Sequence, residues 1–299
     1  MKIIKDVKFL IVGLGLIGGS YAQALTDLGY EVGAITRSQS SIDYAKENGL
    51  ISSGTTEVTR EYVSRFDVIV FALYPNVLLN WLSEYQGYIK DGAVLTDVTG
   101  VKTPIVYKIQ EMLRPEIEFI GAHPMAGKEV YGVQNADKTI FRNANYIVTP
   151  TDKNTPEGIN CCRELGKILG FKTVCEFAPA EHDQIIAFVS QLTHCIAMTL
   201  MTCQQTEHLE DYTGDSFRDL TRIAKINETM WTELFLLNKK ELLSQMDLFI
   251  DKFKELKSAI ECEDTEKMKE IMKTSTERRT YFDKKYKAHG QNIEKEKKT

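Results

Sequence analysis

The feature that most constrains the fold is a junction near the start of the chain, where an apolar run enters a glycine-rich loop. Residues 7–12 (VKFLIV) are typical of a buried parallel strand, and GLGLIG follows at once at residues 13–18. The next residues favour a helix at 20–28, ended by Gly29, and a second strand at 31–35. This order predicts a βαβ unit whose loop binds a dinucleotide.

Three loop glycines have separate physical roles in such a unit. Gly13 makes the tight turn, Gly15 lets the backbone approach a pyrophosphate, and Gly18 lets the helix pack closely on the strand. The N–H groups at the helix N-terminus would bind the phosphates. A glycine-rich turn used only for packing is the alternative, and the flanking strand and helix make it the weaker one. The cofactor-binding residues predicted here are Gly13, Leu14, Gly15, Leu16, Ile17 and Gly18.

The end of the second strand indicates which dinucleotide is bound. An acidic residue at this place usually binds the ribose 2′-hydroxyl and so selects NAD. This chain instead has Thr36, Arg37 and Ser38, whose guanidinium and two hydroxyls could bind a 2′-phosphate. We therefore expect NADP to be preferred over NAD. The alternative is that Arg37 is only a solvated surface charge.

Length and composition exclude several classes of protein. The 299 residues suffice for about two domains, and the formal charge of −5 gives no electrostatic reason to expect nucleic acid. Six cysteines without C-x-x-C or zinc spacing predict buried thiols in a reducing compartment and no metal site. The first strand begins too early to leave room for a signal peptide, and every apolar stretch is interrupted before 18 residues. We expect a cytoplasmic protein that does not bind membranes.

Glycine and proline divide the chain into two halves. All seven prolines lie at or before Pro179, and 17 of the 19 glycines precede residue 180. In the first half, strand-like and helical stretches alternate, which predicts a mostly parallel sheet with helices on both faces. The fold class expected is therefore α/β, a Rossmann-like doubly wound sheet followed by an all-helical domain, with domains at 1–178 and 179–299. After the first two strands, the expected strands are 68–73, 94–96, 119–122, 146–149 and 173–177.

The second half carries more apolar surface than a small helical domain usually buries. Residues 182–201 are apolar nearly all round, which predicts a buried helix, and apolar residues from Leu242 to Ile260 recur at helical spacing. Pairing with a second copy would complete this core, so we expect a homodimer. An intramolecular bundle is the alternative. The charged tail at 284–299 is expected to be a frayed helix end and a disordered terminus.

His123 is the first residue that indicates chemistry. It stands in GAHPMAG, at residues 121–127, directly after a strand that ends at the carboxyl edge of the sheet, where ligands of such sheets bind. A neutral imidazole there could take a proton from a substrate hydroxyl while hydride leaves the same carbon for the nicotinamide. A purely structural histidine is the alternative, and the flanking proline and glycines count against it.

Two further segments of the helical half carry candidate polar residues. His194 lies in SQLTH on the apolar helix, and the residues alone favour a satisfied core histidine. Arg218 and Arg222 stand four residues apart and are expected on one helix face, interrupted by Asp219. Arginine in this setting suits capture of a carboxylate. The alternative is an ion pair within the helix or between domains, and Arg218 fits that role well.

These motifs together resemble the prephenate dehydrogenases of tyrosine biosynthesis. The similarity extends over residues 7 to about 285, and its specific elements occur in a fixed order. They are GLGLIGGS at 13–20, GAHPMAGKE at 121–129, SQLTH at 190–194 and FRDLTRIA at 217–224, followed by Met230 and Trp231.

The resemblance implies a fold and a reaction. The fold is a Rossmann-like domain with a helical dimerisation domain, and the reaction is oxidative decarboxylation of prephenate to 4-hydroxyphenylpyruvate with hydride transfer to NAD(P)⁺. In this comparison His123 matches the histidine that binds the C4 hydroxyl, and Arg222 matches the arginine that binds a substrate carboxylate. His194 and Glu129 become substrate-pocket residues, the latter linking the site across domains or subunits. Trp231 and Asp219 become supporting residues.

The chain departs from the family pattern at two places. Gly100 occupies the position of a serine that helps hold the C4 hydroxyl, and either Thr99 or a water is the candidate that replaces the serine hydroxyl. Asp215 adds a carboxylate before the FRD segment, which leaves prephenate or arogenate open as the substrate. No further domain that could bind tyrosine is expected.

Two other classes of protein remain as alternatives. A β-hydroxyacid dehydrogenase would use a lysine base from the helical half and gives no reason for the HPMAG or FRDLTRIA segments. A non-catalytic NADP sensor would need neither His123 nor Arg222.

Overall fold

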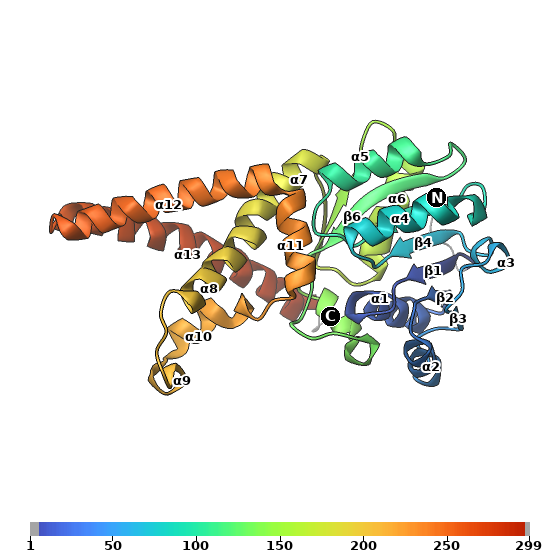
Figure 1. Cartoon of the computed structure of the whole chain (residues 1–299), viewed down its shortest axis with the longest axis horizontal. Coiled ribbons are helices and arrows are strands. Elements are labelled where there is room, and N and C mark those ends of the chain that lie inside the picture. The colour runs from blue at the N-terminus through green and yellow to red at the C-terminus, as the bar shows by residue number, and fades with distance from the viewer. Residues whose placement is uncertain (1–5, 297–299) are drawn as a thin grey trace. The chain divides into compact units, whose positions relative to one another are not determined.

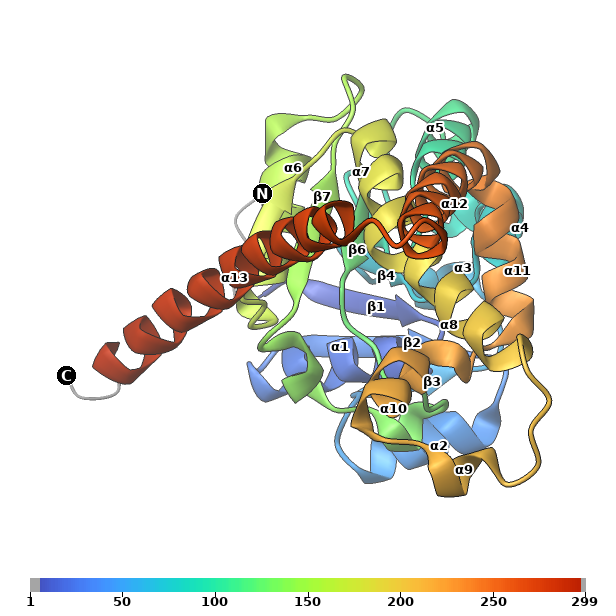
Figure 2. The same cartoon turned by 90° about the vertical axis from the view of Figure 1, so that its left-hand side faces the viewer.

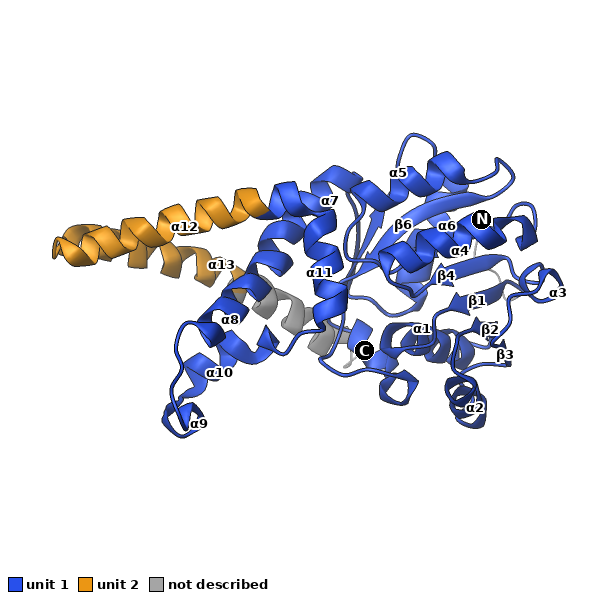
Figure 3. Cartoon of the chain, viewed as in Figure 1, with its two compact units in different colours: residues 1–242 blue, residues 243–299 orange. Residues whose placement is uncertain are grey.

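A computed structural model of the chain describes residues 6–296, with side chains described as far as Phe282. The chain forms two compact units, residues 1–242 and 243–299 (Figure 3). This division falls inside a long helix, so it does not test the domain boundary expected at residue 178. That boundary stays a prediction.

The first unit is built on an eight-stranded sheet with the strand order β3-β2-β1-β4-β5-β6-β7-β8 (Figure 1). The pairs from β3 to β6 are parallel, β7 runs antiparallel to β6, and β8 is parallel to β7. The mostly parallel, doubly wound sheet is thus confirmed. The strands are β1 (Lys8–Val12), β2 (Glu31–Ile35), β3 (Ser53–Thr55), β4 (Val68–Phe71), β5 (Val94–Asp97), β6 (Glu118–Pro124), β7 (Asn145–Thr149) and β8 (Thr173–Glu176).

Helices cover both faces of this sheet, with α1 and α2 on one side and α4 and α5 on the other (Figures 1 and 2). Buried apolar side chains form one cluster under each layer, one containing Tyr21 and Ile42, the other Leu82 and Ile109. The helices are α1 (Leu16–Asp27), α2 (Gln39–Glu47), α3 (Arg60–Val63), α4 (Pro75–Tyr85), α5 (Thr103–Met112) and α6 (Pro156–Ile168). Short 3₁₀ turns lie at Gln86–Tyr88, Val133–Asn135 and Lys138–Phe141.

Local sequence explains where several of these helices begin. The side chains of Ser38, Thr59 and Thr155 each accept a hydrogen bond from an N–H group in the first turn of α2, α3 and α6. Proline stands in the first turn of α4, α5 and α6, where its missing N–H leaves no hydrogen bond unmade. These signals fix where the helices begin, and hence where the strands before them end.

The first unit continues into helices that pack beyond the sheet. They are α7 (Pro179–Ile186), a π-helical turn η4 (Ala187–Leu192), α8 (Thr193–Thr202), α9 (Leu209–Tyr212), α10 (Asp215–Thr221), a 3₁₀ turn η5 (Arg222–Ala224) and α11 (Glu228–Leu237). The helix expected at 182–201 is therefore present as one helical run, from α7 through α8, that contains a π-helical turn in its middle. Such turns are often found near functional sites.

The expectation that this run is buried is wrong for the single chain. Phe188 is 57% exposed, and Ile185, Val189 and Met201 are also exposed. Apolar composition shows that a surface needs to be covered, but it does not show what covers it.

One described helical run, Pro179–Thr202, is long and apolar enough to cross a membrane by length and composition alone. This contradicts the expectation that every apolar stretch is too short. The same run begins with buried His182 and Asp183, and Asp183 accepts hydrogen bonds from the backbone of α5 and the residue before it. Those contacts place its start inside the first unit. The absence of membrane binding stays a prediction.

The second unit is a helical hairpin of α12 (Lys239–Glu261), whose first residues belong to the first unit, and α13 (Thr265–Glu296). The helix predicted from the apolar spacing between 242 and 260 is confirmed. Lys267 of α13 pairs with Glu255 of α12 at 2.9 Å. α13 reaches into the charged tail, whose expected disorder stays a prediction, and residues 297–299 lie outside the described residues.

All six cysteines are free in the structure. Cys161 and Cys162 are buried, but Cys203 and Cys262 are exposed. The expectation of uniformly buried thiols is therefore wrong for the helical half, where less surface is covered within one chain.

Candidate active site

The glycine loop has the geometry that a dinucleotide requires. Gly13 has φ of +99°, and a Cβ added there would lie 2.3 Å from the carbonyl oxygen of Ala72. A Cβ on Gly18 would lie 2.0 Å from the Gly13 carbonyl oxygen, so helix and loop pack too closely for a side chain. Gly15, in contrast, faces open space and precedes α1 without a side-chain cap. The first turn of α1 thus offers N–H groups beside a space that suits a pyrophosphate.

The three residues after β2 lie at the position expected for the adenosine ribose. The Ser38 hydroxyl accepts a hydrogen bond from Ser41 N–H at 3.2 Å and thereby caps α2. Arg37 is exposed, and among the described residues it has no hydrogen-bonding or ionic partner. Thr36 is half-buried, and its N–H donates to the Thr55 carbonyl. Arg37 is thus the group here that is free to meet a 2′-phosphate.

His123 lies within β6, which extends to Pro124 and so is longer than expected at its carboxyl end. Its Nδ1 lies 2.9 Å from Nε2 of His182 in α7. Its Nε2 faces Gly100, since a Cβ added to Gly100 would lie 3.8 Å from that nitrogen. Burial, then the nearby His182 and Lys102, hold the pKa of His123 well below its usual value. The imidazole is therefore a neutral base at neutral pH.

A buried ionic network supports the sheet edge on which His123 lies. The Lys102 ammonium donates to Asp97 at 2.7 Å and also to the backbone carbonyl of Ala122, the residue before His123. Asp97 in turn accepts from the Ala122 N–H at 3.0 Å. Burial lowers the pKa of Lys102, and the Asp97 carboxylate opposes that effect. The sequence motif DVTGVK at 97–102 contains both charged residues five apart, but sequence reasoning gave neither of them a role in the site.

Thr99 belongs to the same network. Thr99 is only 4% exposed. Its hydroxyl donates to the Asp97 carboxylate and accepts from the Lys102 ammonium at 3.2 Å. The hydroxyl is thus engaged by protein groups, and its predicted role toward the substrate stays a prediction.

A second buried acidic group lies behind His123. His182 is fully buried, and its Nδ1 lies 2.8 Å from Oδ1 of Asp183. Asp183 also accepts from the N–H groups of Lys102 and Thr103, each at 2.8 Å. Sequence reasoning missed this pair too. The available signal was an adjacent His-Asp pair at the start of an otherwise apolar helical run.

Four predicted substrate-pocket residues gather on the helical side of the first unit. Arg222 of η5 pairs with Glu129 at 2.6 Å. The His194 ring lies against the Trp231 indole, with 3.8 Å between ring centroids. Burial lowers the pKa of His194, and the charges of Glu129 and Arg222 act on it in opposite directions. The structure thus brings these four residues together.

Leu234 joins this group to His123. It lies one turn after Trp231 in α11, and its side chain would contact a Cβ added to Gly100. Gly100 therefore lies close to both the His123 imidazole and α11, the helix that carries Trp231.

The expectation that Arg218 and Arg222 share one helix face is wrong. α10 ends at Thr221, so Arg222 begins a 3₁₀ turn and takes a different direction. Arg218 pairs within its own helix with Asp215 at 2.6 Å, as its alternative role implied. Asp219 is exposed, and within the described part of the chain no group pairs with it.

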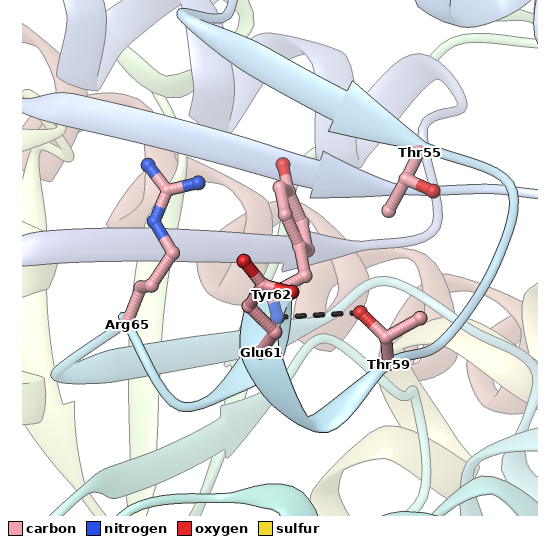
Figure 4. Close-up of a pocket in the computed structure, with 5 residues that line it drawn as sticks. All are labelled: Thr55, Thr59, Glu61, Tyr62 and Arg65. Atoms are coloured by element: carbon pink, nitrogen blue, oxygen red, sulfur yellow. Dashed lines mark hydrogen bonds between the residues drawn. The ribbon is translucent and has the colours of Figure 1, made fainter.

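Figure 4 shows a surface pocket formed by β3, α3 and the residues that follow each. It is lined by Thr55, Thr59, Glu61, Tyr62 and Arg65, none of which is a predicted site residue. Its groups serve the fold, because Thr59 caps α3 at Tyr62 N–H and Arg65 pairs with Glu31. This pocket is separate from the group of residues around His123.

A glycine loop of dinucleotide-binding geometry, a neutral histidine at the sheet edge and a nearby arginine–aromatic group define a nucleotide-dependent dehydrogenase. Comparison with known proteins identifies the family. The family model "Prephenate dehydrogenase, nucleotide-binding domain" matches residues 21–175, and "Prephenate dehydrogenase, dimerization domain" matches residues 178–274. The chain belongs to the prephenate dehydrogenase family and is an oxidoreductase.

Relatives agree with this assignment along nearly the whole chain. The prephenate dehydrogenase of Bacillus subtilis is 30% identical over 93% of this chain and 76% of the relative. A crystal structure of prephenate dehydrogenase from A. aeolicus, in complex with hydroxyphenyl propionate and NAD⁺, is 28% identical with a TM-score of 0.85 over 94% of this chain and 100% of that one. Synechocystis arogenate dehydrogenase is 26% identical with a TM-score of 0.79, over 92% and 100% of the two chains.

Proposed function

We propose that this chain converts prephenate to 4-hydroxyphenylpyruvate and CO₂ with reduction of NAD(P)⁺. The observation that carries the proposal is the geometry of His123, whose Nε2 lies near Gly100, 3.8 Å from a Cβ placed there, while its Nδ1 is held by His182. A neutral base at the carboxyl edge of a nucleotide-binding sheet suits oxidation of a hydroxyl group.

His123 acts on the proton of the C4 hydroxyl. Its Nε2 accepts that proton as the C4 oxygen becomes a carbonyl, while C4 loses its hydride, which NAD(P)⁺ would accept when bound at the glycine loop. The bond to the ring carboxylate then breaks, its electron pair enters the ring, and the proton returns to the C4 oxygen of the phenol. Atoms and charge balance without another reactant. The pKa of His123 lies below its usual value, so the imidazole is neutral and able to accept the proton.

Arg222 binds a substrate carboxylate, since guanidinium groups bind carboxylates in a bidentate geometry. Its pairing with Glu129 holds the guanidinium beside His194 and Trp231. The Trp231 and His194 rings provide a flat apolar surface beside this charge, which suits a ring that becomes aromatic. Asp219 has a supporting role. Thr99 acts through Asp97 and Lys102, by holding the strand end before His123.

NADP is the proposed preferred cofactor, with NAD as the alternative. The loop residues from Gly13 to Gly18 fit the pyrophosphate of either one. Support for NADP comes from the free, exposed guanidinium of Arg37 after β2, where no carboxylate is present to repel a phosphate.

Arogenate is the alternative substrate, and the similarity to Synechocystis arogenate dehydrogenase supports keeping it. In the sequence, the Asp215 carboxylate is the feature that suggests a group able to bind the amine of arogenate. Because Asp215 is paired with Arg218 and strongly exposed, it gives no support for binding the amine of arogenate. Prephenate is therefore the better supported substrate.

A homodimer in the cytoplasm is the proposed state of the chain. The exposed apolar side chains of α7–α8 and of α12 support pairing with a second copy, since such surface is rarely left uncovered. The match to a dimerization domain over residues 178–274 supports the same state.

An assay with purified protein tests the proposed function. Prephenate or arogenate is mixed with NADP⁺ or NAD⁺, and absorbance of the reduced cofactor is followed. We expect the highest kcat/KM with prephenate and NADP⁺. The His123→Asn protein, purified in the same way, controls for contaminating dehydrogenases. No reduction with either substrate under either cofactor would refute the proposal.

A further inference from the structure

A line of three buried or half-buried side chains runs from α7 to the sheet edge. Asp183 Oδ1 lies 2.8 Å from His182 Nδ1, and His182 Nε2 lies 2.9 Å from His123 Nδ1. The two imidazoles meet edge to face, with ring centroids 5.1 Å apart. His182 thus uses both ring nitrogens and His123 uses Nδ1, which leaves Nε2 of His123 on the side of Gly100.

The chemistry of these groups fixes where the ring protons lie. An ionised carboxylate only accepts hydrogen bonds, so His182 carries its proton on Nδ1 and donates it to Asp183. The Nε2 of a neutral His182 is then an acceptor, which requires His123 to carry its proton on Nδ1. The Nε2 of His123 is left without a proton, which is the state that a base needs.

The anchor at Asp183 is rigid. Its Oδ1 accepts from the Lys102 N–H and its Oδ2 from the Thr103 N–H, so backbone donors hold both oxygens. Burial acts to raise the pKa of Asp183, but the hydrogen bonds from His182 and Thr103 hold it below its usual value. The carboxylate therefore stays ionised and keeps its role as an acceptor.

We propose that His182 and Asp183 are positioning residues that fix the tautomer of His123, with Nδ1 protonated and Nε2 free for the substrate hydroxyl. This inference rests on the proposed function only for its catalytic consequence. It explains why an ionised carboxylate and an imidazole stand at the start of an apolar helical run, at a cost in desolvation. The alternative, that His182 merely fills space, makes a different prediction for variants of similar size.

Two variants separate positioning from packing. His182→Gln keeps a side-chain oxygen that accepts from His123 Nδ1–H, whereas His182→Phe keeps the volume of a ring and removes the acceptor. In His182→Phe the Nδ1–H of His123 would be a buried donor without an acceptor, so the His123 tautomer protonated at Nε2 is favoured. We expect His182→Phe to lower kcat by about 10- to 100-fold, and His182→Gln to stay within about fivefold of the parent protein. The Kd for the cofactor should be unchanged in both.

Nitrogen-15 NMR of histidine-labelled protein reads the tautomer without any turnover. The parent protein should show His123 protonated at Nδ1 and unprotonated at Nε2, and His182→Gln should show the same. His182→Phe should move the proton to Nε2. His208, which is exposed and lies outside the site, provides a control through His208→Gln, expected to change neither signal nor rate.

The outcomes are distinguishable. A parent protein with His123 protonated at Nε2 would overturn the proposal, as would a folded His182→Phe protein with parent-like kcat. If His182→Phe fails to fold, the spectra of the parent protein and of His182→Gln still decide. Absence of turnover with a correct tautomer would refute the proposed function and leave the positioning role standing.

Discussion

Replacing Arg222 by alanine tests how the site binds a carboxylate. The guanidinium is 66% exposed and pairs with Glu129, which is 40% exposed, so solvent screens the charge and Glu129 competes for it. A hydrogen bond to a charged group is worth about 1.5–3 kcal/mol, and this exposure favours the lower value. A loss of about 1.5 kcal/mol corresponds to roughly a tenfold rise in KM, with kcat nearly unchanged if ground and transition states lose the contact equally.

Arg218 provides a matched control, because it stands four residues earlier and is 61% exposed. Its partner is Asp215, in its own helix. Steady-state kinetics of Arg218→Ala should match the parent protein, and both variants should keep their thermal midpoint, since exposed ion pairs contribute about 0–1 kcal/mol. An unchanged KM in Arg222→Ala, or an equal rise in both variants, would refute the assignment of the carboxylate site to Arg222.

Three further predictions follow from groups around the cofactor and the base. His123→Asn should lower kcat by about 10²- to 10⁴-fold with cofactor Kd preserved, and near-normal turnover would remove His123 from the mechanism. Arg37→Ala should raise KM for NADP⁺ several-fold and leave KM for NAD⁺ unchanged; equal effects on both would contradict the 2′-phosphate site. The folded-state pKa values of His123, His182 and His194 lie below the unfolded value of about 6.5, so the unfolded chain binds more protons below that pH. The contribution of these histidines to the free energy of unfolding should thus be complete above about pH 6.5 and be lost as the pH falls below that value. A urea midpoint that rises on acidification would contradict these shifts.

The strands and the nucleotide loop could be predicted because their signals are local. An apolar run followed by glycine specifies β1 and the loop from adjacent residues alone. β3 was missed because its three residues, Ser53–Thr55, carry no apolar run and pair with β2 only through backbone. The length of β6 was underestimated because its last residues are held by pairing with β7: His123 pairs with Ile147, 24 residues further along the chain, and Pro124 with Tyr146, 22 residues further along.

The side chains that support His123 could not be predicted in the same way. His182 lies 59 residues from His123 in sequence, and Asp183 lies 81 residues from Lys102. Hydrogen bonds over such separations depend on how α7 packs on α5, and no local periodicity encodes that packing. The resemblance to a family identified residues expected to meet the substrate, whereas residues that act through other residues required the folded structure.

Gly100 shows why the positioning of His123 matters more in this chain than the family pattern suggests. A serine hydroxyl at this position would share the C4 hydroxyl with the histidine, but the glycine has no hydroxyl to offer, and a Cβ placed there would only contact Leu234 and lie 3.8 Å from His123 Nε2. The nearest hydroxyl in sequence, that of Thr99, is taken up by Asp97 and Lys102. Under the proposed mechanism, His123 would then orient the substrate hydroxyl as well as receive its proton. A wrong tautomer would remove both functions at once, which gives the link through His182 to Asp183 its importance.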